Sequence, residues 1–233
     1  MSEVEVLDLA RTDLRECNAR LHAAAEDERA PRAWRVLNPG GRHNLAVGLD
    51  GELTVEVEGH VGYYCAGMNE LAQVRIDGNC GVGIAENMMS GTVIVRGDAS
   101  QSAGASARGG LLAIHGQASA RCAISLKGGD VVVRGSIGHM GAFMAQRGRL
   151  VVCGDAGDAL GDSLYEARIY VRGAVASLGA DCVEREPSPE QRAELARLLG
   201  RAAVDDVEPG DFRLYESARR LYSFEVDDAG GYA

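Results

Sequence analysis

The sequence predicts a mainly β fold: a right-handed parallel β-helix (solenoid) of about seven 19-residue rungs, with flanking capping helices at both ends. Three observations predict it. The pattern apolar-x-apolar-polar-Gly recurs seven times, at every nineteenth residue and without a slip. Residues 40–179 contain all but four of the 31 glycines and none of the 5 prolines. Aromatic residues make up only 5% of the chain, so small and β-branched side chains must fill the core.

Residues 1–35 are expected to form an N-terminal strand, a helix and a linker. Residues 3–9 alternate in polarity as in a short strand. Thr12 is a suitable N-cap for a helix, whose apolar face would carry Leu14, Cys17, Leu21 and Ala24. Residues 31–39 begin and end with proline and contain the only tryptophan, Trp34, and we interpret them as the linker.

Residues 36–183 contain the repeat and are expected to form the solenoid. Valine, isoleucine or leucine stands two and four residues before each closing glycine, and these alternate positions must face one interior because strand side chains have a period of two. Glycine at the end of each strand permits positive φ or a close approach of stacked backbone. We treat these seven as structural glycines: Gly59, Gly78, Gly97, Gly116, Gly135, Gly154 and Gly173.

Stacking such units in register gives a parallel β-helix. A left-handed hexapeptide helix needs a period of 18, and the calcium-binding nonapeptide repeat needs G-G-x-G-x-D, which is missing. A right-handed helix with irregular corners remains, since this is the usual hand of parallel crossovers.

One residue of each strand lies between the two inward positions and must point outward. In five consecutive rungs it is apolar, and an exposed strip of this kind requires a cover. The chain's own terminal helix and a partner subunit fit equally well. We therefore name the strip a candidate partner interface: Ile94, Ala113, Val132, Val151 and Tyr170.

Residues 184–233 are expected to form a C-terminal helix and a docking tail. Ser188 and Gln191 have the spacing of a capping box, with Pro189 in the first turn. Leucines then make an apolar stripe that includes Leu195, Leu198 and Leu199. The segment 212–226 is aromatic and is expected to dock on the column or on another subunit.

Composition limits the classes of partner. The formal charge of −10 argues against nucleic acid, and neither a signal segment nor an apolar run long enough for a membrane span is found. Six cysteines without a C-x-x-C pair indicate reduced, structural thiols in a cytoplasmic protein. The five histidines form no metal-binding pattern. We therefore assign no catalytic, cofactor-binding or metal-binding residue to this chain.

Three groups of polar residues are interpreted as structural and not as catalytic or ligand-binding. The residues that stand immediately before the closing glycines form an outward-facing ladder, which we interpret mainly as a solvated face: Glu58, Asp77, Arg96, His115, Arg134, Cys153 and Arg172. The triplet Arg42-His43-Asn44 precedes no helix and no Walker motif, so an irregular first rung explains it as well as an anion site does. Asp155, Asp158 and Asp162 are expected to bind local backbone.

Glycine-rich rungs such as GNCGVGIAENMMSGTVIVRG and GSIGHMGAFMAQRGRLVVCG resemble the GXGXG-type β-helix. That domain occurs in the glutamate synthase large subunit and in one chain of formylmethanofuran dehydrogenase. With RHNLAVGL before the rungs and FRLYESARRLYSFEVDDAGGY after them, the chain is similar to the free-standing small subunit of N-methylglutamate synthase. The resemblance implies two further chains, a class II amidotransferase-like subunit and a glutamate-synthase-like subunit that holds FMN and an iron–sulfur cluster.

The implied reaction makes N-methylglutamate from methylamine and glutamate and releases ammonia. The chain would be the scaffold that holds the other two subunits in register. Two alternatives remain: the scaffold of a formylmethanofuran dehydrogenase-type oxidoreductase, and a free-standing β-helix enzyme acting on carbohydrate. The carbohydrate enzyme would need carboxylates clustered in a long groove, whereas the outward columns here carry scattered charge.

Overall fold

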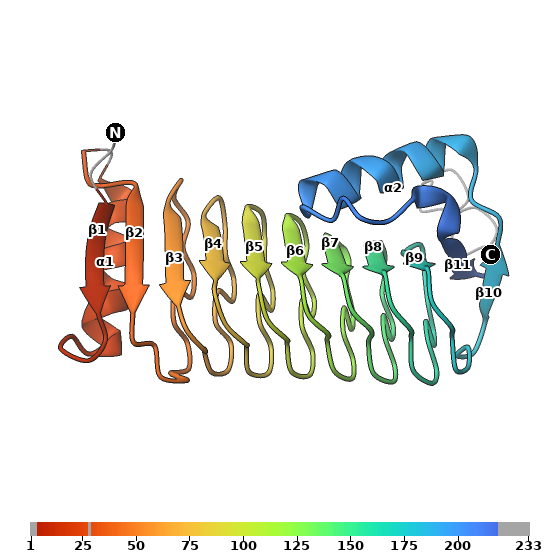
Figure 1. The fold of residues 1–233 in the computed structure, drawn as a ribbon, viewed down its shortest axis with the longest axis horizontal. Coiled ribbons are helices and arrows are strands. Elements are labelled where there is room, and N and C mark those ends of the chain that lie inside the picture. The colour runs from red at the N-terminus through yellow and green to blue at the C-terminus, as the bar shows by residue number, and fades with distance from the viewer. Residues whose placement is uncertain (1–3, 28, 219–233) are drawn as a thin grey trace, which may run out of the picture.

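Within the part of the chain that the structure describes, eleven strands join into one continuous sheet (Figure 1). The chain is seen in a computed structural model that describes residues 4–27 and 29–218. The elements in chain order are β1 (Val4–Asp8), α1 (Leu14–Glu26), β2 (Ala33–Leu37), β3 (Thr54–Glu58), β4 (Gln73–Ile76), β5 (Thr92–Val95), β6 (Leu111–Ile114), β7 (Lys127–Val133), β8 (Arg147–Val152), β9 (Arg168–Val171), β10 (Cys182–Arg185), α2 (Pro189–Arg201), a short 3-10 helix (Pro209–Asp211) and β11 (Arg213–Ser217).

Strands β3 to β9 are the seven predicted repeats, and they stack in parallel. Val55 lies opposite Val74, and Val74 opposite Val93, so the pairing register follows the 19-residue period. The inward-facing side chains of these strands are at most 1% exposed. A second line of parallel bridges, starting with Val61 and Cys80, joins the same rungs at another side. The predicted β-solenoid of about seven rungs is confirmed.

In the turn that follows this second line of bridges, every other residue has a left-handed backbone conformation. In the rung of β3 these are Tyr64, Ala66 and Met68, with φ between 51° and 59°. The amides of Tyr64 and Met68 donate to the next rung, whereas the amide of Ala66 donates to the carbonyl of Leu45 on the previous one. The middle position is fully buried in several rungs and faces the core, which explains why it is only alanine or glycine.

The closing glycines are required by close approach of stacked backbone. A Cβ on Gly78 would lie 2.4 Å from the carbonyl oxygen of Gly59, and one on Gly116 would lie 2.3 Å from Oδ1 of Asp98. Only Gly59 among these seven has a positive φ, of 130°. Close approach, one of the two roles predicted for these glycines, is therefore confirmed as the general one.

The residue after each closing glycine can bind the next rung through its side chain. Oδ1 of Asn79 accepts from the amide of Asp98 at 2.9 Å, and Oδ1 of Asp98 accepts from the amide of Gln117 at 2.8 Å. Asp155 does the same for Ala174, 19 positions on. The prediction of a local backbone partner is therefore wrong for Asp155, because its partner is on the neighbouring rung.

The N-terminal end is closed by α1, as predicted, with Cys17, Leu21 and Ala24 buried. The cap is Asp13 and not Thr12, since the Asp13 side chain accepts from the amide of Glu16. The predicted linker is wrong, because Ala33–Leu37 form β2, which pairs in parallel with both β1 and β3.

The C-terminal end is closed by strands. β11 inserts between β9 and β10 and is antiparallel to both, so residues 213–217 of the predicted docking tail lie on the column. The remainder of that tail, from residue 219 on, lies outside the described residues. The capping box of Ser188 and Gln191 is confirmed. However, α2 lies along the side of the sheet over β6 to β9, and not across the end of the column (Figure 1).

Candidate functional site: the seam between helix α2 and the solenoid

The apolar strip predicted as a partner interface lies under α2. Ala113, Val132, Val151 and Tyr170 are fully buried and share one apolar cluster with Leu195, Leu198 and Leu199 of the helix. Ile94, at the edge of the helix, packs against the cluster and is partly buried. Of the two covers considered, the chain's own helix is the correct one. A partner could reach these four residues only by displacing α2.

The outward ladder has two parts, which meet where α2 ends. Cys153 is 1% exposed and belongs to the cluster beneath the helix. Nε2 of His115 lies 3.0 Å from the carbonyl oxygen of Ala202, the C-cap of α2. Arg134 pairs with Asp206 just beyond the helix. This half of the ladder therefore attaches the C-terminal segment and is not a freely solvated face.

His115 is held in its neutral form. Burial lowers its pKa, and the positive charges of Arg96, Arg134 and Arg75 lower it further, while the hydrogen bond to Ala202 opposes them. No carboxylate is among these influences, so His115 is a structural residue at the seam, as the sequence favoured.

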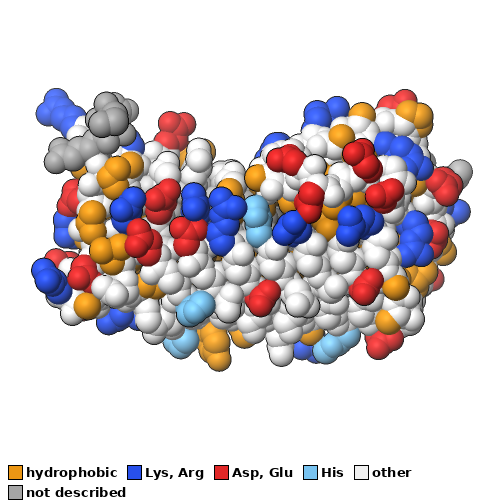
Figure 2. All heavy atoms as spheres, in the orientation of Figure 1, with side chains coloured by type: hydrophobic (Ala, Val, Ile, Leu, Met, Phe, Trp, Pro, Cys, Tyr) orange, Lys and Arg blue, Asp and Glu red, His pale blue; other side chains and the backbone are white. Residues whose placement is uncertain are grey.

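The uncovered half of the same sheet face carries charges that neutralise one another. Arg35 pairs with Glu56 and Glu58, and Arg75 pairs with Glu56 and Asp77. Figure 2 shows acidic and basic side chains alternating along this row on the part of the sheet that α2 leaves open. Such exposed pairs contribute little to stability. They do keep this half of the face polar.

A chain of ion pairs fastens α2 to strands β7 to β9. Arg149 is the central residue: it forms a two-pronged pair with Asp130, through Nε at 2.6 Å and Nη2 at 2.9 Å, and it also pairs with Glu194 of α2. Arg168 binds the other oxygen of Glu194 at 3.1 Å. Burial alone would lower the pKa of Arg149, but the hydrogen bond to Asp130 and the charges of Asp130 and Glu194 raise it. The guanidinium therefore remains charged.

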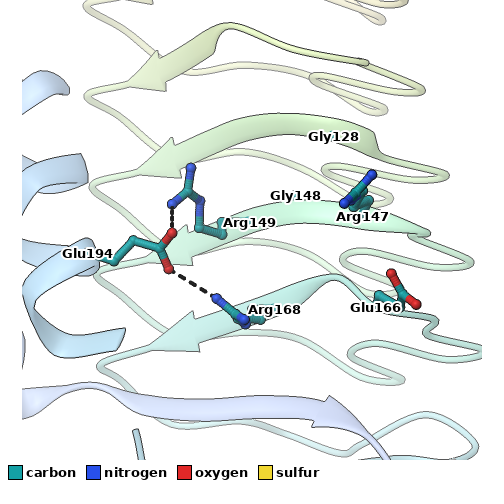
Figure 3. A pocket seen from close by; sticks show the side chains of 7 residues that line it. All are labelled: Gly128, Arg147, Gly148, Arg149, Glu166, Arg168 and Glu194. Atoms are coloured by element: carbon teal, nitrogen blue, oxygen red, sulfur yellow. Dashed lines mark hydrogen bonds and ion pairs between the residues drawn. The ribbon is translucent and has the colours of Figure 1, made fainter. Parts of the chain in front are cut away.

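A cavity of about 540 Å³ opens beside this network. Its lining residues are Gly128, Arg147, Gly148, Arg149, Glu166, Arg168 and Glu194. Figure 3 shows Glu194 clamped between Arg149 and Arg168, whereas Arg147 and Glu166 lie on the side away from it. Both carboxylates that approach Arg149, those of Asp130 and Glu194, are ion-paired. The guanidinium groups of Arg149 and Arg168 are likewise engaged by these carboxylates, so the charged groups on this side of the cavity hold α2 in place.

The Asp130–Arg149 pair was missed by reasoning from the sequence. The two residues lie directly opposite on adjacent rungs, and opposite charges at the same position of consecutive repeats were the available signal. Glu194 had no such signal, because its place depends on where α2 docks.

The Arg42-His43-Asn44 triplet belongs to an additional first rung. The amide of Gly62 donates to the carbonyl of Arg42, and the amide of Tyr63 donates to Nδ1 of His43 at 2.8 Å. The rings of His43 and Tyr63 stack with centroids 4.4 Å apart. The irregular-rung interpretation is thus confirmed.

The thiols are buried and protonated. Burial raises the pKa of Cys17, Cys153 and Cys182 to about 11, and that of Cys65 and Cys122 to about 12. All six cysteines are free. Within the described ranges, no three histidine, cysteine or acidic side chains gather as a metal site would need. Of the helices in the same part of the chain, none has the length and apolarity to cross a bilayer.

Comparison with known proteins shows similarity to a curated relative and to a solved structure. Protein GlxC of Rhizobium meliloti (strain 1021) is 58% identical over 227 residues, which cover 97% of this chain and 99% of that protein. A chain of the formyltransferase/hydrolase complex (FhcABCD) of Methylorubrum extorquens, solved with methylofuran, has a TM-score of 0.51 and 25% identity. That match covers 68% of this chain and 70% of the other. No family model matches the chain.

Proposed function

The chain belongs to the GlxC family, and from this premise we propose that it is the scaffold subunit of a multi-subunit glutamate-synthase-like complex, N-methylglutamate synthase. The complex would convert methylamine and glutamate into N-methylglutamate and ammonia. A class II amidotransferase-like subunit and a subunit with FMN and an iron–sulfur cluster would carry the chemistry. This chain would hold those two subunits at a fixed separation.

The observation that carries the scaffold role is the match to one chain of a multi-subunit enzyme, at 25% identity over about two thirds of each chain. The site geometry agrees with it. The ionisable groups at the seam are committed to attaching α2, as Arg149 and Glu194 illustrate. The thiols that could act as nucleophiles are buried with raised pKa values.

A solenoid suits this role because each rung contacts only its neighbours and repeats at a constant step. The rungs are joined by strand pairing on one side, by bridges on a second, and by side chains such as Asn79 and Asp98 that bind the next rung. A subunit bound at one end would therefore be held at a defined distance from a subunit bound at the other.

The test is to purify the chain from its native host through a lysine-free tag, identify the accompanying subunits by mass spectrometry, and record a flavin spectrum. We expect an amidotransferase-like chain, a yellow FMN and iron–sulfur chain, and turnover of methylamine with glutamate. A colourless chain that emerges alone contradicts the scaffold role. A complex without methylamine-dependent turnover contradicts the assigned reaction and leaves the scaffold role intact.

A second candidate is a scaffold in a one-carbon complex of the formylmethanofuran type, which the likeness to the formyltransferase/hydrolase complex favours. Companion chains with formyltransferase activity and no flavin would select this alternative.

A further inference from the structure

Three exposed cations are stacked on consecutive rungs at the starts of β7 and β8 and at the corresponding place before β6. Lys127 lies opposite Arg147 in the pairing of β7 and β8. Arg108 is on the preceding rung, since the amide of Lys127 donates to the carbonyl of Ala107. At ~4.8 Å per rung the three charges span about 10 Å. We call Arg108, Lys127 and Arg147 the basic stripe.

The basic stripe forms no ion pair within the described chain, and one carboxylate, that of Glu166, lies on the rung after it. The three cations are unpaired there although the chain as a whole has a formal charge of −10. Glu166 follows Arg147, but no ion pair joins them (Figure 3). Like charges directly opposite on neighbouring strands destabilise a sheet. The row of Arg35, Glu56 and Arg75 shows that the same solenoid neutralises stacked charges elsewhere.

Apolar side chains stand at both ends of the basic stripe. Met89 is opposite Arg108 on one side and is 41% exposed. Tyr165, which is 43% exposed, stands beside Glu166 on the rung after Arg147. The cavity lined by Arg147, Arg149 and Arg168 adjoins the stripe. The surface is thus a line of cations with an exposed methionine at one end and an exposed tyrosine beside Glu166 at the other, next to a hollow lined with arginines.

We propose that the basic stripe is the docking site for an acidic segment of a partner subunit. Such a segment would place carboxylates against Arg108, Lys127 and Arg147, and apolar side chains against Met89 and Tyr165. The flanking apolar residues favour a polypeptide over a nucleic acid, and the net charge of this chain disfavours both nucleic acid and a second copy of itself. The inference rests on the scaffold role proposed above and assigns a place for one partner.

Lys127 makes the contact identifiable, because it is the only lysine in the chain. A carbodiimide joins an amine to a carboxylate that touches it, without a spacer. We would treat the purified complex with carbodiimide and locate cross-linked peptides by mass spectrometry. The expected result is an amide bond between Lys127 and an aspartate or glutamate of a partner subunit.

Two other cross-links would overturn the proposal. A bond from Lys127 to Glu225, Asp227 or Asp228 would assign the stripe to the chain's own C-terminal residues. A bond between two copies of the chain would assign it to self-association.

The variant Lys127→Glu gives an independent test with opposite effects on the free chain and on the complex. Replacing the middle cation relieves repulsion, so the thermal midpoint of the isolated chain should rise. Affinity for the partner should fall at least tenfold and should lose much of its dependence on salt. Arg15→Glu, an equal charge change on an exposed residue of α1, should leave affinity within twofold.

Unchanged assembly of Lys127→Glu would overturn the docking site and leave the scaffold role standing, because a complex still forms. A lower midpoint in the isolated variant would also overturn it, because an anion of the same chain would then already neutralise Lys127. If the unaltered chain has no companion subunits, the scaffold role itself fails.

Discussion

Nε2 of His115 donates a hydrogen bond across 3.0 Å to the carbonyl oxygen of Ala202, a residue 87 positions later in the chain. The contact joins the middle of the solenoid to the C-cap of α2. It fixes the position of the helix end over the sheet and defines where the covered half of the outer face begins.

This contact predicts a pH dependence. The pKa of His115 is lowered from its ordinary value of 6.5, first by burial and then by the neighbouring arginines. As the pH falls below that value the unfolded chain binds a proton before the folded chain does, so stability is lost. We expect wild type to lose more stability than His115→Gln between about pH 7.5 and pH 5, measured by urea denaturation at both values. Equal losses would contradict the assignment.

Val132→Asp should disrupt the docking of α2. The side chain of Val132 is 0% exposed beneath the helix, and an unpartnered carboxylate there should cost about 3–5 kcal/mol in the free energy of unfolding. Arg75→Asp is the matched control, at the equivalent position of the uncovered half, and should cost less than about 1 kcal/mol. Denaturant titration of both variants is the measurement. A small effect of Val132→Asp would mean that α2 leaves the sheet readily.

Arg149→Gln should destabilise the seam by about 3–5 kcal/mol, because Asp130 is 6% exposed and would lose its main partner. Arg201, at 3.6 Å from Asp130, remains as a weaker one. The double variant Asp130→Asn/Arg149→Gln should cost less than the single one, since no carboxylate is then left buried. Denaturant titration of these two variants and of the single variant Asp130→Asn measures the coupling, and additive losses would show that the pair is not coupled.

An added methyl group should have opposite effects at a closing glycine and at a glycine of α2. Gly116→Ala places a Cβ 2.3 Å from Oδ1 of Asp98 and should cost about 3 kcal/mol. In α2, Gly200 has nothing within 4 Å of the added atom, and Gly200→Ala should stabilise by about 0.5–1 kcal/mol. Thermal and chemical unfolding of the two variants compare them directly.

The repeat made most of the solenoid predictable. A fixed period placed β3 to β9 and their register, because each closing glycine must pass close to the one before it. β2 was missed because it carries no closing glycine and lies 21 positions before its partner, as the pairing of Trp34 with Val55 shows. The proline-bounded segment therefore looked like a linker.

The seam was less predictable, because its contacts are distant in sequence. The strip from Ala113 to Tyr170 was recognisable as needing a cover, but periodicity alone could not distinguish an internal helix from a partner. Left-handed turn residues such as Tyr64 and Met68 also escaped notice, since neither is glycine. Their amides donate to the next rung, while the amide of Ala66 between them donates to the previous one.

The unbroken 19-residue period has a consequence for how the assembly can vary. Each rung adds ~4.8 Å to the column, and inserting or deleting one whole rung among β3 to β5 would leave the register of every other rung unchanged. The distance between the N-terminal end and the docked helix α2 can therefore change only in steps of that size. The separation between the two ends of the column is therefore set in whole rungs.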